Sequence, residues 1–349
     1  MKNVGAASFG LSLILAAAFG LAGCGSLPPG QTGAPQAATV AYVWGSNYPT
    51  FDGGPPQTIL QYSTISPQAS SPVGTLTLPS SCNGGPIATD YVGQLYVACF
   101  SPSSSPWILV YPPNSVGTAT PSRTIEMGSS SYEIATLTVG ASGELYVGSL
   151  KPGDQVQPFE LRAYPATASG TAVPDRVIEL KYGLWDVVAD AEGNIYVLEY
   201  STYVNDGAPL SFVDVYPPGK FTQPIRTISF PFFAYGIGVD ARGGIFVSAS
   251  EQVGNTWPFT AILEYAPDAS GYASPINTIQ LPAQTAGMEV GGGPVRIDSA
   301  GNMFAAIRFG APFEAATFVL YSVGPPYSDQ AVPVAETNPA GYNAVFALH

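Results

Sequence analysis

Charged side chains are scarce in this chain. Only 10% of the 349 residues are charged, and 24 acidic residues outnumber 11 basic ones, for a formal net charge of −13. Nucleic-acid binding is excluded because phosphates are neutralised by Lys and Arg, and so little charge argues against a coiled coil. The single histidine is the last residue, His349. His-based catalytic triads and His-rich zinc sites are therefore excluded as well.

Helical periodicity and common catalytic motifs are also missing. Beyond residues 1–23, no stretch of 12 residues has the apolar spacing of an amphipathic helix. There is no Gly-x-Ser-x-Gly elbow, and the glycines at 291–293 lack the Lys and Ser/Thr of a phosphate-binding loop. Glycine (39) and proline (34) are abundant instead. In a chain without a sequence repeat this composition suggests low complexity. In a chain with a regular repeat it predicts many short strands joined by turns.

The first 23 residues have the pattern of an export signal. Lys2 precedes an apolar run that ends in residues 21–24 (LAGC), which resemble a bacterial lipobox. The resemblance implies that Cys24 is acylated, becomes the mature N-terminus and holds the protein at a membrane. The alternative is an ordinary signal peptide with an incidental cysteine. Because Gly25 rather than Asp follows, we expect the outer membrane of the cell envelope in an organism with two membranes.

Three regions follow from this pattern. Residues 1–23 are the lipoprotein signal peptide, residues 24–39 form a flexible Pro/Gly/Ala/Gln tether, and residues 40–349 form one folded domain.

A short motif recurs along the folded domain. It has Asp or Gly, two loop residues, Gly, a further residue, an aliphatic residue and then an aromatic, usually followed by Val. The aromatic positions are 96, 146, 196, 246 and 304, at intervals of 50, 50, 50 and 58 residues. Each unit also has three further segments with the alternation and β-branched content of strands. Four antiparallel strands per repeat of about 50 residues predict a propeller blade.

The turn motif (DAEGNIYV at 190–197) resembles those of NHL-repeat and SMP-30-like six-bladed β-propellers. Residues 40–79 supply only three strands of a blade. Residues 342–347 supply the missing innermost strand, on an alignment that makes Val345 equivalent to Arg296. The sequence thus predicts an all-β, six-bladed propeller of four-stranded antiparallel blades, closed when the C-terminal strand completes the first blade.

Two predictions concern recurrent residues. The repeated Asp is expected to bond backbone amides in its turn, and the Gly to supply a positive φ. The Arg that begins most fourth strands is expected at an outer edge, where its charge discourages sheet addition.

The remaining cysteines bracket one predicted hairpin. Cys82 precedes the innermost strand of the second blade and Cys99 ends its antiparallel neighbour. In an exported protein this arrangement predicts a disulfide. Two free buried thiols are the alternative.

Candidate binding residues lie where the innermost strands begin, on the face that carries long, non-repeated loops. These loops are rich in acidic and aromatic residues, which suits a cation, a sugar or a peptide. Arg296 is the one charge at its inner-strand position and is either a ligand contact or a solvated liner. The ligand-binding candidates are Glu133, Trp185, Asp186, Tyr235, Glu289, Arg296 and Asn343.

The sequence leads us to expect a lipid-anchored, extracytoplasmic, monomeric binding module without a catalytic residue or an obligatory cofactor. Its ligand would be a protein, peptide or carbohydrate. One alternative is a Ca²⁺-dependent lactonase or hydrolase, because the resemblance to SMP-30-like enzymes implies an acidic and amide metal site that Glu133, Asp186 and Asn343 could form. Another alternative is a structural envelope protein.

Overall fold

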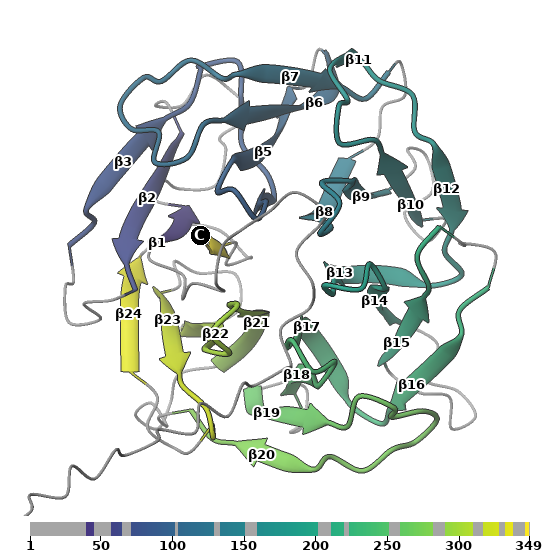
Figure 1. Cartoon of the computed structure of the whole chain (residues 1–349). Coiled ribbons are helices and arrows are strands. Elements are labelled where there is room, and N and C mark those ends of the chain that lie inside the picture. The colour runs from purple at the N-terminus through teal and green to yellow at the C-terminus, as the bar shows by residue number, and fades with distance from the viewer. Residues whose placement is uncertain are drawn as a thin grey trace, which may run out of the picture.

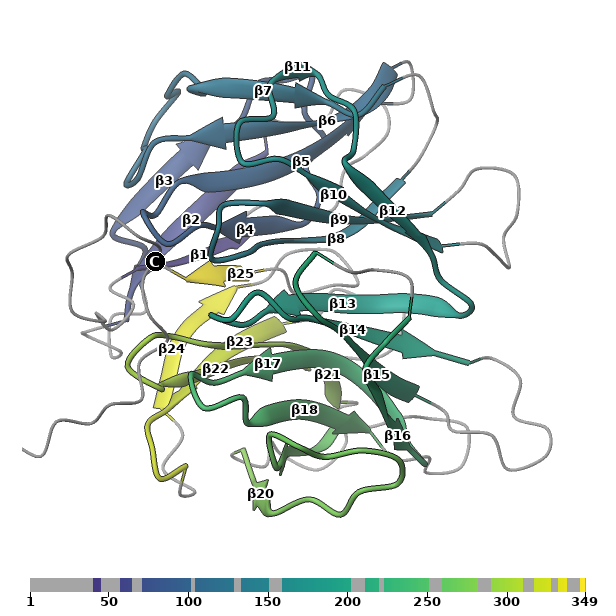
Figure 2. The same ribbon diagram turned by 45° about the vertical axis from the view of Figure 1, so that its right-hand side comes forward.

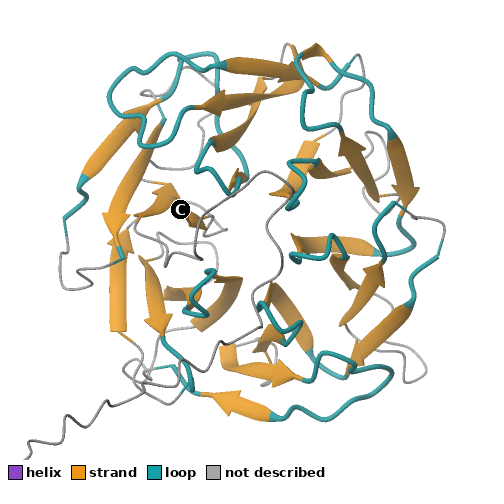
Figure 3. Cartoon of the chain, in the orientation of Figure 1, coloured by secondary structure: helices purple, strands orange, loops and turns teal. Residues whose placement is uncertain are grey.

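The computed structural model describes residues 40–44, 57–64, 71–101, 104–128, 133–150, 159–201, 211–219, 223–250, 259–281, 290–309, 317–327, 332–337 and 346–348. In these residues all regular structure is β-strand. Figure 1 looks along the axis of a ring of six sheets, and Figure 3 shows strands and loops only. The predicted six-bladed β-propeller is confirmed. No helix long and apolar enough to cross a membrane occurs in this part of the chain.

The first three blades follow one another along the chain. The first consists of β25 (Phe346–Leu348), β1 (Val40–Trp44), β2 (Thr58–Ser63) and β3 (Gly74–Thr77). The second consists of β4 (Ile87–Thr89), β5 (Leu95–Ser101), β6 (Ser104–Tyr111) and β7 (Arg123–Glu126). The third consists of β8 (Glu133–Val139), β9 (Leu145–Leu150), β10 (Phe159–Tyr164) and β12 (Arg176–Glu179).

The other three blades repeat this order. The fourth consists of β13 (Gly183–Ala189), β14 (Ile195–Tyr200), β15 (Ser211–Tyr216) and β16 (Arg226–Phe230). The fifth consists of β17 (Phe233–Val239), β18 (Ile245–Ser250), β19 (Phe259–Tyr265) and β20 (Asn277–Ile279). The sixth consists of β21 (Val290–Ile297), β22 (Met303–Phe309), β23 (Thr317–Val323) and β24 (Val332–Thr337).

The C-terminal strand closes the ring as predicted, but in a different register. β25 pairs antiparallel with β1, and Ala347 lies opposite Tyr42. In the sixth blade Arg296 lies opposite the equivalent aromatic, Phe304. Ala347, and not Val345, therefore occupies the position of Arg296. The sequence alignment was two residues off because the C-terminal strand lacks the turn motif that marks register in the other blades.

The hydrophobic core lies between the blades. Six clusters of buried side chains each join two neighbouring sheets, as in the cluster that packs Tyr96, Ile108 and Val110 of the second blade against Leu137 and Val147 of the third. The tilted view in Figure 2 shows the sheets stacked face to face around the ring. Because both faces of most strands are covered, apolar runs replace simple alternation.

The recurrent Asp and Gly have the structural role expected of them. The carboxylate of Asp90 accepts the backbone N–H groups of Val92 and Gln94 at 3.1 and 2.8 Å. The glycine of the turn has φ between +81° and +85° in five blades, at Gly93, Gly143, Gly193, Gly243 and Gly301. A left-handed backbone favours glycine because it carries no Cβ. These carboxylates therefore shape turns.

The arginine of the outer strand has a different role from the one predicted. Arg123 donates to the carbonyl oxygens of Ala166 and Ala168 in the next blade, at 2.6 and 3.1 Å, and to the Tyr96 hydroxyl at 2.7 Å. It links two blades rather than standing as a charge at an open edge. The edge of β7 is itself covered by the short strand β11 (Gly170–Thr171), which pairs parallel to it from the third blade.

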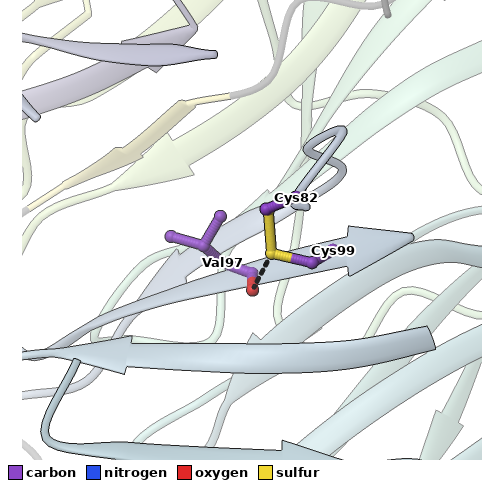
Figure 4. The surroundings of a disulfide bond; sticks show 3 residues. All are labelled: Cys82, Val97 and Cys99. Carbon is purple, nitrogen blue, oxygen red and sulfur yellow. Dashed lines mark hydrogen bonds between the residues drawn. A yellow bond between two sulfur atoms is a disulfide. The ribbon is translucent and has the colours of Figure 1, made fainter. Parts of the chain in front are cut away.

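The predicted disulfide is confirmed. Cys82 and Cys99 are bonded, with their Cα atoms 4.8 Å apart, and both residues are buried. The bond joins the segment before β4 to the end of β5 (Figure 4), so it fastens the open end of the hairpin.

Candidate functional site

Four of the innermost strands share an irregularity near their first residues. A β-bulge interrupts the pairing between residues 134 and 136 in β8, 184 and 186 in β13, 234 and 237 in β17, and 292 and 295 in β21. Bulges re-aim side chains and are common beside active sites. Here they lie at the end of the propeller remote from the Asp turns. We call this end the loop face.

Two of these bulges carry aromatic side chains, which form one row with a third. The ring of Trp185 lies between those of Tyr200 and Tyr235, with centroid distances of 4.8 and 5.1 Å. All three side chains are half-buried. Trp185 Nε1 is buried, and no hydrogen-bond partner for it is found among the described residues. We call Tyr200, Trp185 and Tyr235 the aromatic row.

A glycine makes room for this row. A Cβ on Gly183 would lie 2.1 Å from the Tyr200 ring. Burial raises the pKa of both tyrosine hydroxyls, so they are neutral hydrogen-bond donors at physiological pH. Half-buried aromatic rings that carry tyrosine hydroxyl groups suit the C–H face and hydroxyl groups of a sugar ring.

Next to the row, Asp186 and Arg296 form an ion pair. The two terminal guanidinium nitrogens of Arg296 donate to the two carboxylate oxygens of Asp186 at 2.8 and 2.9 Å. The Asp186 side chain is 5% exposed and that of Arg296 is 21% exposed. The carboxylate also accepts the backbone N–H groups of Val187 and Ile237, at 2.9 and 3.2 Å, and the Thr136 hydroxyl at 3.4 Å.

Asp186 does not fit the role of a Ca²⁺ ligand. Calcium binds through several oxygen ligands with negative charge, whereas both oxygens of this carboxylate face a guanidinium that neutralises it. No group of three His, Cys, Asp or Glu residues is arranged to hold a metal ion in the part of the chain that the structure describes.

Glu199 is a second buried carboxyl at the loop face. It precedes Tyr200 on β14, lies opposite Leu184 of β13 and is 2% exposed. The backbone N–H of Tyr182 donates to its Oε2 at 3.2 Å. Burial, and then the negative charge of Asp214, raise the pKa of Glu199 to about 8. A carboxyl with such a pKa is protonated near neutral pH and suits proton transfer.

The structure describes some of the predicted binding residues and not others. Trp185, Asp186, Tyr235 and Arg296 come together on blades four to six. Glu133 begins β8, but its side chain is not described. Glu289, Asn343 and the lipidation candidate Cys24 lie outside the described residues, as do most of the long loops of this face.

Two residues of the site were not among the predicted ones, Tyr200 and Glu199. A signal for Glu199 existed in the repeat, because the equivalent positions hold Cys99, Ser149, Ala249 and Ile307, uncharged residues that fit a buried site. A lone carboxyl in such a series departs from the repeat. Tyr200 had no comparable signal, since its place beside Trp185 depends on the bulge in β13.

Fold and site together define an all-β, six-bladed propeller with an aromatic row and buried carboxyl groups at its loop face. No known protein family and no curated protein matches the chain. Among solved structures, it is similar to the periplasmic gluconolactonase of Pseudomonas aeruginosa, with a TM-score of 0.50 and 13% identity over 86% of this chain and 83% of that one. An ulvan lyase, a polysaccharide lyase, matches with a TM-score of 0.44 and 13% identity over 76% of each chain.

The first comparison corrects the expectation of a non-enzymatic binding module. One solved structure that shares this fold, matched over 83% of its length, is an enzyme named for its action on a lactone. The alternative prediction, a propeller lactonase or hydrolase, agrees with this finding and the binding module does not. The resemblance to NHL-repeat and SMP-30-like chains beyond the propeller architecture stays a prediction.

Proposed function

We propose that this protein is an extracytoplasmic hydrolase that opens a sugar lactone at the loop face of blades four to six. The observation that carries the proposal is the aromatic row, whose three half-buried rings are tilted by 34° and 57° against one another and include two tyrosine hydroxyl groups. A sugar lactone has a matching shape, with C–H groups on its ring faces and hydroxyl groups around its edge. The likeness in fold to a periplasmic gluconolactonase supports the same substrate class.

The chemistry requires a proton for the leaving oxygen. Water adds to the lactone carbonyl carbon, the bond from this carbon to the ring oxygen breaks, and that oxygen becomes a hydroxyl group. We assign this proton donation to Glu199, which precedes Tyr200 of the aromatic row on β14 and whose raised pKa keeps it protonated near neutral pH. The attacking water gives up two protons, of which one returns to Glu199 and the other enters the solvent, and the product is an open-chain sugar acid released as the carboxylate.

The proposal is tested by measuring the rate of hydrolysis of five- and six-membered sugar lactones, after subtraction of the spontaneous rate. We expect activity in the wild type and a loss of at least about tenfold in kcat/KM in Trp185→Ala, because the stacking surface is lost. Glu199→Gln should lower kcat by about 100-fold and abolish the fall in kcat near pH 8. Arg176→Gln, which breaks an ion pair with Glu144 at the Asp-turn end, is the matched control and should keep full activity.

Two outcomes would overturn the assignment. A folded wild type that hydrolyses no lactone above the spontaneous rate would exclude the function. Unchanged kinetics in both Trp185→Ala and Glu199→Gln would place the reaction elsewhere on the molecule.

We also propose that residues 1–23 are removed and that acylated Cys24 anchors the propeller to the outer membrane through the tether at 24–39. The disulfide supports an oxidising compartment. Expression in a bacterium fed a labelled fatty acid tests the anchor. Label should enter the wild type and not Cys24→Ser, and equal labelling of both would refute it.

A further inference from the structure

Arg296 reaches across a blade. It lies on β21 of the sixth blade, and its partner Asp186 lies on β13 of the fourth, 110 residues earlier in the chain. The fifth blade's innermost strand, β17, lies between them in the ring (Figure 1). The pair therefore connects three innermost strands and not two neighbours.

We propose that Asp186 and Arg296 are positioning residues that hold Trp185 and Tyr235 in the geometry that receives the sugar ring. This inference rests on the proposed function for the identity of the ligand. We call the ion pair and its backbone hydrogen bonds the brace.

The brace acts directly on both bulges that carry the aromatic residues. Asp186 follows Trp185 in the chain, and its own carboxylate accepts the next backbone N–H, that of Val187, at 2.9 Å. On β17, Ile237 ends the bulge that contains Tyr235. Its N–H donates to Asp186 at 3.2 Å, and its carbonyl oxygen accepts from Arg296 at 3.2 Å.

Close packing of β17 against β21 lets the arginine reach this far. A Cβ on Gly236 would lie 2.2 Å from the carbonyl oxygen of Gly293, and one on Gly238 would lie 3.2 Å from that of Val295. The positions equivalent to Arg296 in the other blades hold residues without charge, namely Ala88, Thr138, Val188, Gly238 and Ala347. The brace is thus particular to this side of the ring.

The hydrogen bonds of the pair explain why it positions rather than binds. One guanidinium nitrogen of Arg296 donates to Asp186, Ile237 and Val295, and the other donates to Asp186. Both oxygens of Asp186 accept from the guanidinium and from backbone N–H groups. Neither charge is left to attract an ionic substrate, so the effect of the brace on a ligand passes through the aromatic row.

The test compares Arg296→Gln and the double variant D186N/R296Q with the wild type. In the double variant no buried charge loses its partner. We therefore expect this variant to fold and to be measurable even if the single variant does not fold. The first readout is the near-UV circular dichroism and fluorescence of Trp185, isolated from the other three tryptophans by subtracting the W185F spectrum in each background. The second is KM and kcat for the lactone. Arg176→Gln again serves as the control.

We expect the Trp185 spectrum to change and KM to rise roughly tenfold in both variants, with kcat reduced less, because a small displacement of a binding surface weakens binding. The control should change neither. A folded D186N/R296Q protein with the wild-type Trp185 spectrum and wild-type KM would overturn the brace. A wild type that hydrolyses no lactone refutes the proposed function alone, since the Trp185 spectrum still decides the brace.

Discussion

Aspartate has two distinct roles in this propeller, and its surroundings separate them. Asp90, Asp190, Asp240 and Asp298 accept backbone N–H groups within their own turns, so each acts on a few neighbouring residues. Asp186 instead joins an arginine from another blade and backbone groups from two strands. The same side chain is thus a turn former where its partners are local and a cross-link where they are distant.

Glu199 leads to a prediction about pH and stability. Its pKa is raised to about 8 in the folded protein, above the ordinary value of 4.5. Its contribution to stability is therefore fully present below pH 4.5 and is lost as the pH rises towards 8, because the unfolded chain releases this proton first. Each unit of pKa shift corresponds to about 1.4 kcal/mol.

We expect Glu199→Gln to become progressively more stable than the wild type between pH 5 and pH 8, by on the order of a few kcal/mol, with no further gain above pH 8. Urea unfolding at several pH values measures this difference. Glu179→Gln, at an exposed position, is the control and should show no such trend. A stability difference that does not vary with pH would contradict the raised pKa.

At the scale of elements, neighbouring blades are joined at their outer edges as well as through their cores. Gly117 exchanges two backbone hydrogen bonds of 2.7 Å with β3 of the preceding blade, and Gly271 makes the same kind of contact with β16. β11 covers β7 in the same way. Unpaired strand edges invite aggregation, and for β3, β7 and β16 the loop between the third and fourth strands of the next blade covers the edge.

The innermost strands are joined most closely where β17 meets β21. We predict that Gly236→Ala destabilises the protein by about 3 kcal/mol, because the new methyl group would overlap the backbone of Gly293 and Pro294. Gly292→Ala is the matched control. Its Cβ would lie no closer than 3.3 Å to any atom, the nearest being Ser248 Oγ, so we expect a cost below about 1 kcal/mol. Chemical denaturation measures both, and equal costs would refute the close approach.

At the scale of the whole molecule, the ring depends on a strand from the far end of the chain. β25 pairs with β1, its Ala347 is buried against the first and second blades, and the Leu348 carbonyl accepts a hydrogen bond from Thr89. Without this strand, β1 would have an open inner edge, and the sixth and second blades would lose a shared neighbour.

Deletion of residues 346–349 is therefore expected to lower the melting temperature by on the order of 10 °C and to promote association through the exposed edge. Differential scanning calorimetry and size-exclusion chromatography measure these effects. Deletion of His349 alone, which leaves β25 intact, is the control. A truncated chain as stable and monomeric as the control would show that closure by β25 is dispensable.

The blades, their turns and the closing strand were predictable because each depends on local chemistry. Apolar alternation marks a strand, Asp and Gly mark the turn, and five copies 50 to 58 residues apart reinforce one another. The register of the closing strand was not predictable to the residue, since Phe346–Leu348 lacks those marks. The disulfide was predictable because its cysteines bracket one hairpin.

The sequence by itself determined the propeller, because its period and turn residues act over a few positions at a time. Only the tertiary structure decided the site. The aromatic row depends on bulges that no residue pattern predicts. The Asp186–Arg296 brace depends on the ring, which brings β13 and β21 to either side of β17. Burial of Glu199 raises its pKa, and that burial exists only once the chain has folded.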